Sequence, residues 1–248
     1  DEFNGYGIRY FEDQKYEGDF KNGEYHGQGK YYYGTHIYEG EWRQGVEHGL
    51  GLKIYNDGSR IKGTFVHGMV EGYVEIEYDD GATYKGNMRA GKKDGNGVYT
   101  YADRTEYDGQ YKAGLRYGRG IMTYPDGEKH IGEYLSGELH GDTTKIYSNG
   151  DKETGSYQYG LKHGEHVYTD KAGYYEKASF KKGVMDGQRF ISFASGDSVI
   201  STYRDGYKNG IEEYTYKNGE VVKCQYRDGR INGKCENFDT AKKLTSVC

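Results

Sequence analysis

The chain has 248 residues with 34 basic and 39 acidic side chains, and its net charge of −5 gives no positive field that would attract nucleic acid. Thirty residues are tyrosine and 41 are glycine, against one proline and one tryptophan. This composition indicates a short repeated unit and leaves too few Leu, Ile and Val for a thick core. No apolar run reaches the roughly 18 residues of a membrane helix and no signal-peptide pattern opens the chain, so a soluble protein is expected.

The chain opens with residues 1–15, which read as a partial repeat. The stretch NGYGIRYFED supplies the second strand of a unit whose first strand is missing. Because the sequence starts at Asp1 without Met, we expect a fragment or a processed form. A strand left without a neighbour can pair with another chain, so a homodimer through the end repeats is one expected assembly.

From residue 16 onward, the pattern Gly-x-x-x-Gly recurs every 23 residues, with a single spacing of 22. Repeats of this length are typical of arrays in which each unit buries surface only against its neighbours. The ten pairs are Gly23/Gly27, Gly45/Gly49, Gly68/Gly72, Gly91/Gly95, Gly114/Gly118, Gly137/Gly141, Gly160/Gly164, Gly183/Gly187, Gly206/Gly210 and Gly229/Gly233.

Each unit is numbered here from Tyr16 as position 1. Position 3 is small, usually Gly, and position 5 is large, usually aromatic, while positions 2 and 4 are mainly polar. Positions 14, 16 and 18 alternate in the same way. Alternation with period two indicates a strand with one buried face, so each unit reads as strand, turn, strand. The NDG, DDG, PDG, SNG and KNG stretches predict tight turns, and Gly-x-x-x-Gly predicts a longer one.

The glycines could instead be taken for a phosphate-binding loop, because YEGDFKNGEYHGQG is followed by Lys30. A P-loop requires Gly-x-x-x-x-Gly-Lys, and residue 24 is Glu rather than Gly. We therefore interpret the glycines as structural. The glycines at positions 8 and 12 permit turns, and those at positions 3 and 14 leave room for rings of the adjoining hairpin.

Units such as YEGDFKNGEYHGQG and YEGEWRQGVEHGLG resemble the MORN repeat (membrane occupation and recognition nexus). The resemblance is closest over five regular repeats, residues 16–129. Residues 130–235 are similar to a divergent MORN variant, and residues 236–248 read as a C-terminal cap or tail. The resemblance implies an all-β fold: an elongated, twisted, single-layer antiparallel array of about ten stacked hairpins, forming one domain over residues 1–248.

The large side chains of positions 1 and 5 are predicted to gather on one face of this sheet. A single layer cannot cover both of its faces, so we expect some of these rings to form the wall of an open groove that docks a helical or extended partner segment. The predicted groove residues are Tyr16, Phe20, Tyr38, Trp42, Phe65, Tyr84, Met88, Tyr107, Tyr111 and Tyr134.

Position 6 is basic in seven of the ten units and predicts a row of cations along one edge. One reading is a docking strip for anionic phospholipid, and the other is a solvated edge that discourages edge-to-edge association. The row comprises Lys21, Arg43, Arg89, Lys112, Lys181, Arg204 and Arg227.

Catalytic and metal-binding roles find no support in the sequence. His26, His48, His140 and His163 recur about 10 Å apart, too far to share one metal ion, and no nucleophile lies in a recognisable triad. No catalytic residue, metal or cofactor is predicted. Cys224 and Cys235 replace glycines at positions 3 and 14 of one hairpin. A disulfide between them is one reading, but two small residues tolerated in an end unit, in a reducing compartment, is the preferred one.

The sequence thus predicts a non-enzymatic scaffold for protein partners. The resemblance implies a cytoplasmic place in a cytoskeletal or ciliary assembly, or at the periphery of a membrane. Two alternatives stay open: a tether that binds anionic lipid through the basic row, and a regulatory domain of a larger enzyme.

Overall fold

The alternating sequence pattern produces strands throughout. A computed structural model describes residues 3–247, which contain strands and turns but no helix. The chain divides into two compact units, Asp1–Pro125 and Asp126–Cys248. The division lies close to residue 129, where the regular repeats were predicted to end, and each unit is described separately.

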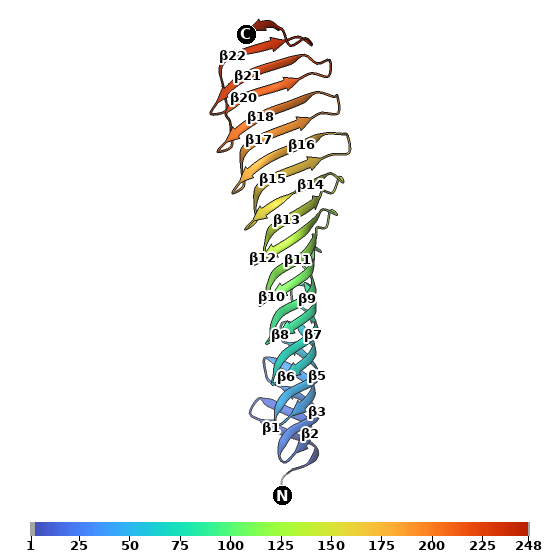
Figure 1. The fold of residues 1–248 in the computed structure, drawn as a ribbon. Coiled ribbons are helices and arrows are strands. Elements are labelled where there is room, and N and C mark those ends of the chain that lie inside the picture. The colour runs from blue at the N-terminus through green and yellow to red at the C-terminus, as the bar shows by residue number, and fades with distance from the viewer. Residues whose placement is uncertain (1–2, 248) are drawn as a thin grey trace. The chain divides into compact units, whose positions relative to one another are not determined.

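Unit 1 is an open antiparallel sheet in which each strand pairs with the next in sequence (Figure 1). Five hairpins follow an edge strand, β1. Its strands are β1 (Gly5–Phe11), β2 (Gln14–Lys21), β3 (Glu24–Tyr32), β4 (His36–Arg43), β5 (Val46–Tyr55), β6 (Arg60–Val66), β7 (Met69–Glu77), β8 (Thr83–Arg89), β9 (Lys92–Thr100), β10 (Glu106–Lys112) and β11 (Leu115–Thr123).

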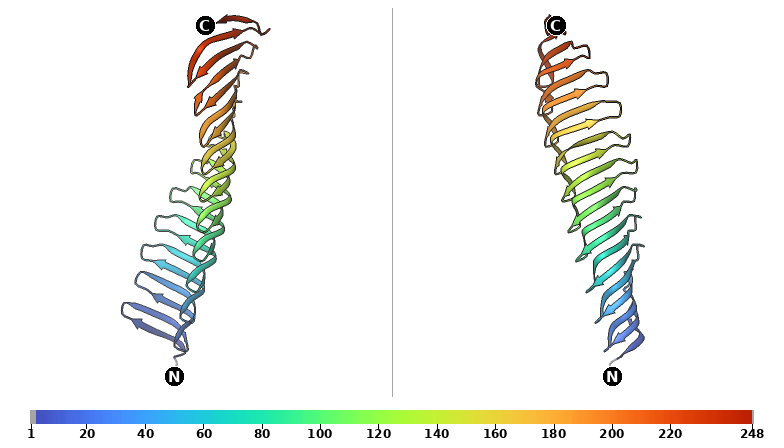
Figure 2. Two further views of the ribbon diagram at one scale, coloured as in Figure 1. Left: turned by 60° about the vertical axis from the view of Figure 1, so that its left-hand side comes forward. Right: turned by 45° about the vertical axis from the view of Figure 1, so that its right-hand side comes forward.

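Unit 2 repeats this order with five more hairpins and a final edge strand, and the views of Figure 2 show no second layer over its strands. Its strands are β12 (Lys129–Leu135), β13 (Glu138–Ile146), β14 (Lys152–Gln158), β15 (Leu161–Thr169), β16 (Tyr175–Lys181), β17 (Val184–Ser192), β18 (Ser198–Arg204), β19 (Tyr207–Lys208), β20 (Gly210–Thr215), β21 (Val221–Arg227), β22 (Arg230–Phe238) and β23 (Leu244–Val247). The predicted all-β array of about ten antiparallel hairpins is confirmed.

The two kinds of turn are the reverse of the prediction. Positions 7 and 8 form a two-residue turn with positive φ at both residues, as at Asn22 (52°) and Gly23 (74°), which is the type I′ geometry. The NDG type of stretch forms a three-residue loop instead. There Gly58 has a φ of 97° and its N–H donates to the carbonyl of Tyr55. Gly-x-x-x-Gly therefore begins in the tighter turn.

The second glycine of Gly-x-x-x-Gly lies inside a strand, at a bulge where the hairpin register shifts. At this bulge the Asp19 carboxylate accepts a hydrogen bond from the N–H of Gln28 (3.1 Å), and Glu41 accepts one from Leu50 in the same way (3.1 Å). A Cβ at Gly49 would come within 2.3 Å of the Glu41 carboxylate. Glycine at position 12 thus makes room for a side chain from position 4.

Adjacent hairpins are joined at their type I′ turns as well as through their strands. The N–H of the position 8 glycine donates to the position 10 carbonyl of the preceding hairpin, as from Gly45 to Tyr25 and from Gly183 to Lys162 (2.9 and 2.8 Å). Each turn is therefore hydrogen-bonded by its neighbour, as expected for an array whose units are stabilised only by neighbouring units.

Candidate functional site

The sheet of each unit has two different faces. Positions 1, 3 and 5 point to what is called here the front face, and positions 2 and 4 point to the back face. The fully buried tyrosines belong to position 1, and they are Tyr16, Tyr38, Tyr84 and Tyr107, each with 0% exposure. The front face of unit 1 is therefore its core.

Each position 1 tyrosine folds across the glycines of positions 3 and 14 of its own hairpin. A Cβ on Gly29 would meet the Tyr16 hydroxyl at 2.3 Å, so only glycine fits beneath the ring. The Tyr16 hydroxyl donates to the carbonyl of Asp19 (2.8 Å), and that of Tyr84 donates to Asn87 (2.8 Å). The prediction that these glycines make room for rings is right, but the ring comes from the same hairpin.

The position 5 rings pack edge-on against these tyrosines, and cations lie over them. Ring centroids of Tyr38 and Trp42 are 5.2 Å apart at 89°, and those of Tyr38 and Phe65 are 5.0 Å apart at 83°. The Lys53 ammonium lies 5.3 Å from the Phe65 ring centre and pairs with Glu47 (2.8 Å). The packed rings and the cations above them together cover the front face of unit 1.

Lys93 shows how fully the front face is covered. Its ammonium lies within 5.8 Å of four ring centres, those of Tyr78, Tyr84, Tyr99 and Tyr111, and is nearest to Tyr99 at 3.8 Å. Burial among these rings lowers the pKa of Lys93 to about 8. The cation fills space that a partner would need.

The predicted aromatic groove is therefore wrong as an open surface. Nine of its ten residues are at most 6% exposed, and the tenth, Met88, is half-buried. The physical reason is that the rings pack on one another and on the glycine pairs of their own hairpins. The buried members are Tyr16, Phe20, Tyr38, Trp42, Phe65, Tyr84, Tyr107, Tyr111 and Tyr134.

The hollows of unit 1 lie on the back face instead. One of them has a volume of about 600 Å³ and spans β3 to β7, with Gly40, Gly51 and Gly63 among its lining residues. Leu50 and Tyr73 stand beside it with 68% and 58% of their surface exposed. Its other lining residues are Gln28, Glu39, Leu52, Lys62 and Glu75. A second hollow of about 580 Å³ along β7 to β10 is lined mainly by polar side chains.

Each residue of the predicted basic row is the last residue of a first strand, with four of them in unit 1 and three in unit 2. All seven side chains are exposed. Position 9, which pairs with position 6 across the type I′ turn, is often apolar and exposed, as in the pairs Lys112↔Leu115 and Lys181↔Val184. The turn edge of each unit thus presents cations beside aliphatic side chains.

In unit 2 the position 1 tyrosine is replaced, and one replacement creates a buried ionic cluster. The Glu153 carboxylate accepts hydrogen bonds from His166 Nδ1 (2.8 Å) and the Tyr147 hydroxyl (2.6 Å), and it pairs with Lys162. His166 Nε2 also lies 2.8 Å from the carbonyl oxygen of Ser156. Burial alone would raise the pKa of Glu153, but these donors lower it to about 2.

The next hairpin carries a second ion pair at the same two positions. Glu176 accepts from Arg189 Nε (2.8 Å) and from the Tyr174 hydroxyl (2.6 Å). Burial raises and these two donors lower the pKa of Glu176, and the net direction is downward. Positions 1 and 14 therefore hold a tyrosine over glycine in four hairpins of unit 1 and an acid with a base in these two.

A front-face pocket of about 350 Å³ lies between the two ion pairs, over the strand pair β15–β16. It is lined by Glu153, Lys162, His166, Tyr168, Tyr174, Glu176, Ala178 and Phe180. Sequence reasoning missed this site because each of these residues was taken as a variation on a repeat position. The available signal was that Glu153 with His166, and Glu176 with Arg189, change together at positions 1 and 14.

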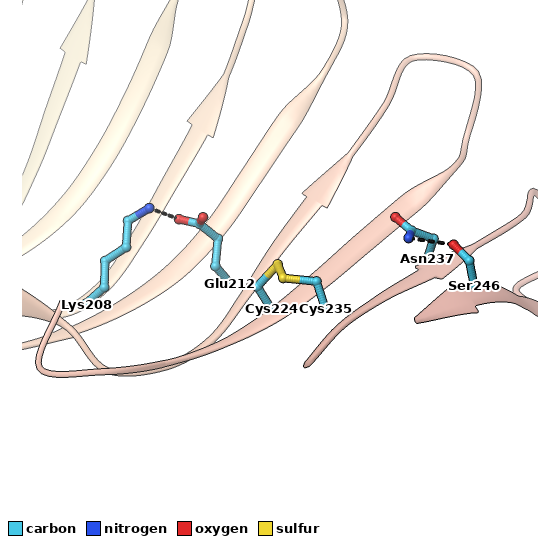
Figure 3. The surroundings of a disulfide bond; sticks show 6 residues. All are labelled: Lys208, Glu212, Cys224, Cys235, Asn237 and Ser246. Atoms are coloured by element: carbon cyan, nitrogen blue, oxygen red, sulfur yellow. Dashed lines mark hydrogen bonds and ion pairs between the residues drawn. A yellow bond between two sulfur atoms is a disulfide. The ribbon is translucent and has the colours of Figure 1, made fainter. Parts of the chain in front are cut away.

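Cys224 and Cys235 form a disulfide (Figure 3), so the expectation of two unlinked small residues is wrong. Positions 3 and 14 lie directly opposite each other in the hairpin register, which brings the two Cα atoms within 4.3 Å. The bond takes the place of the glycine pair and its tyrosine in the last complete hairpin.

Residues 3–247 contain no cluster of three or more His, Cys, Asp or Glu side chains arranged to hold a metal ion. Within the same residues, nothing forms a helix long and apolar enough to cross a membrane.

The fold defines the chain as an all-β array of hairpin repeats. The MORN repeat model matches residues 16–36, 38–60, 84–106 and 107–129, and each matched unit contains one of the four fully buried position 1 tyrosines. The chain therefore contains four MORN repeats, all within residues 16–129. Among curated protein sequences there is no match.

Solved structures similar to the chain include domains of CPAP proteins. The TCP domain of SAS-4 (dCPAP) of Drosophila melanogaster, solved with a proline-rich motif of Ana2 (dSTIL), is 15% identical with a TM-score of 0.35, covering 65% of this chain and 82% of that one. The G-box domain of the microcephaly protein CPAP is 19% identical with a TM-score of 0.29 (76% and 97% covered). The wild-type TCP10 domain of Danio rerio CPAP is 19% identical with a TM-score of 0.27 (79% and 98% covered). Likenesses this distant say nothing about function.

Proposed function

We propose that this chain is a non-enzymatic repeat scaffold that docks an extended or helical segment of a partner protein. The docking surface is the back-face hollow of unit 1, in place of the aromatic groove that the sequence predicts. The MORN repeats support the scaffold role in general, because arrays of this kind offer a regular surface and, in this chain, no catalytic constellation is predicted.

The observation that carries the proposal is the exposure of Leu50 and Tyr73 beside a hollow with glycines among its lining residues. Large apolar side chains around a depression, with a polar rim, are typical of the energetic centre of an interface. The rim contains Glu39 and Glu75 against Lys62. We infer that the partner segment has an apolar anchor residue with basic residues beside it.

The test combines proximity labelling in cells, which names candidates, with calorimetry on a purified candidate segment and the full chain. Leu50→Glu and Tyr73→Glu should each weaken binding at least about tenfold, as expected for residues at the centre of an interface. Ile211→Glu is the matched control, because Ile211 occupies the same position 13 on the back face of unit 2 and is 56% exposed. Equal effects of all three changes would contradict the proposed surface.

The cellular place proposed for the scaffold is the cytoplasm, in a cytoskeletal or ciliary assembly. Partners named by the labelling experiment test this directly. A homodimer through end strands β1 or β23 is a further proposal, and light scattering across a range of protein concentrations tests it.

A second candidate function is a peripheral membrane tether that binds anionic phospholipid. The turn edge favours it, because exposed cations stand beside exposed aliphatic side chains such as Leu115 and Val184. Charge reversal at Arg43, Arg89 and Lys112 should abolish co-sedimentation with anionic vesicles, since each basic residue near such a surface contributes on the order of 1 kcal/mol. Reversal at Lys62 and Lys85, on the back face, is the control. Binding that survives the first set and not the second would contradict the tether.

A third candidate is a regulatory domain whose catalytic part lies elsewhere in a longer polypeptide. The reading frame of the full gene tests it, because an adjoining catalytic domain would be evident in the translated sequence.

A further inference from the structure

The pocket over β15–β16 lies where the strand pair β3–β4 of unit 1 holds two large aromatic side chains at the same repeat positions. Over β3–β4 of unit 1, positions 10 and 5 hold Tyr25 and Trp42, whose ring centroids are 5.4 Å apart, and the indole N–H donates to the carbonyl of Gly29 (3.1 Å). Over β15–β16 the same positions hold Lys162 and Phe180. No indole lies at the corresponding place over β15–β16, where the pocket is found.

The walls of this pocket suit an aromatic guest. The rings of Tyr168 and Tyr174 lie 6.0 Å apart at 66° on one side, and Phe180 lines the other, with the buried Ala178 (2% exposed) among the lining residues. Edge-to-face contacts with such rings stabilise an additional ring beyond the area that it buries. Ala178 leaves room where a larger side chain would fill the pocket.

The polar groups of the pocket suit a neutral hydroxyl. The Lys162 ammonium has three N–H donors, and Glu153 is its carboxylate partner. Each oxygen of Glu176 accepts one hydrogen bond, which leaves lone pairs available. A phenol can accept from Lys162 and donate to Glu176 at once. An ionic guest of either sign would meet a like charge, since carboxylates and an ammonium line the same space.

We propose that this pocket of unit 2 binds a phenol group, as the side chain of a tyrosine in a partner segment. The chain contains its own precedent, because four hairpins of unit 1 each bury a tyrosine on the same face and satisfy its hydroxyl with a hydrogen bond. The pocket is separate from the back-face hollow of unit 1, so this inference and the proposed function can fail independently.

The test is a titration of the full chain with N-acetyl-tyrosinamide, followed by amide chemical shifts, with N-acetyl-phenylalaninamide as the matched probe. We expect saturable shifts confined to the strands around β15 and β16, and binding at least about fivefold weaker for the phenylalanine probe, which lacks the hydroxyl. Equal binding of the two probes, or no saturable shift with either, would overturn the proposal.

A cavity-filling variant tests the location of the site. Phe180→Trp places a tryptophan at position 5, where unit 1 has Trp42 over β3–β4. The indole should fill the pocket and abolish the chemical-shift changes caused by the probe. The thermal midpoint should stay at or above that of the parent chain. Tyr226→Trp also places a tryptophan at position 5, in the hairpin β21–β22, and should leave binding unchanged. Undiminished binding by a folded Phe180→Trp chain would also overturn the proposal.

Discussion

At the scale of the residue, four of the five hairpins of unit 1 are distinguished by the hydroxyl of a position 1 tyrosine. Its ring covers two glycines, and its O–H satisfies a carbonyl near the bulge, so the packing and the hydrogen bond depend on each other. Burial raises the pKa of Tyr84 to about 12, which keeps the hydroxyl protonated and able to donate at physiological pH.

Substitutions at Tyr84 separate these two contributions. Tyr84→Phe should cost about 1 kcal/mol of unfolding free energy, because the carbonyl of Asn87 loses its donor, and Tyr84→Ala should cost about 3 to 5 kcal/mol through the cavity it leaves. Urea denaturation measures both. Tyr73→Ala serves as the control, since Tyr73 is 58% exposed and should change stability by less than about 0.5 kcal/mol. Equal losses at the two tyrosines would contradict the core assignment.

Glu153 gives a pH-dependent prediction. Its pKa is about 2 in the folded chain against an ordinary 4.5, so its stabilisation is complete above about pH 4.5 and is lost as the pH falls toward 2. Glu153→Gln should be destabilised by about 3 kcal/mol at pH 7, because the buried Lys162 pair loses its carboxylate. The difference between parent and variant in urea midpoint should shrink between pH 5 and 2.5. Glu165→Gln, at an exposed ion pair, should show no such trend.

The repeat pattern predicted that the recurring glycines are structural, but it could not predict that Trp42 and Tyr107 are buried. The alternation of side chains along a strand predicts on which face of the sheet a ring lies. It does not predict which other side chains cover that face. The covering groups, such as Lys53 and Lys93, come from other strands of the sheet. Burial of the rings therefore followed only from the pairing of whole hairpins.

At the scale of the hairpin, the type I′ turn places a residue of position 7 at positive φ whatever its type. Ala113 has a φ of 51°, a conformation that costs an alanine about 1 kcal/mol or more, whereas asparagine tolerates it. Ala113→Asn creates the Asn-Gly turn already present at Asn22-Gly23 and should raise the unfolding free energy by about 0.5 to 1 kcal/mol. Asn22→Ala should do the opposite in thermal denaturation. A loss of stability in Ala113→Asn would contradict the turn assignment.

The disulfide makes a prediction for the hairpin β21–β22. Closing a loop with a sequence separation of 11 contributes about 3 kcal/mol in the chain-entropy account. Reduction, or the Cys224→Ser change, should therefore speed amide hydrogen exchange in β21, β22 and the edge strand β23, while unit 1 keeps its protection. Unchanged exchange after verified reduction would show that the bond adds nothing to this hairpin.

At the scale of the whole molecule, neighbouring strands are the elements in contact within each unit, as expected for a linear array. A core substitution should then act locally. Phe65→Ala in β6 should lower hydrogen-exchange protection most in β6 and β7, less in β5 and β8, and leave unit 2 unchanged. An equal loss of protection in both units would show that the chain unfolds as one cooperative body.

The sequence by itself determined the repeat, its 23-residue length, the strands and the positions of the turns, because these depend on local alternation and on glycine at fixed spacing. Tertiary structure alone decided that the rings of positions 1 and 5 are core, that the hollows of unit 1 lie on the opposite face, and that Glu153, His166 and Lys162 form one cluster. The physical reason is that burial and ion pairing depend on which side chains of adjacent strands meet. A pattern read along one strand does not contain that information.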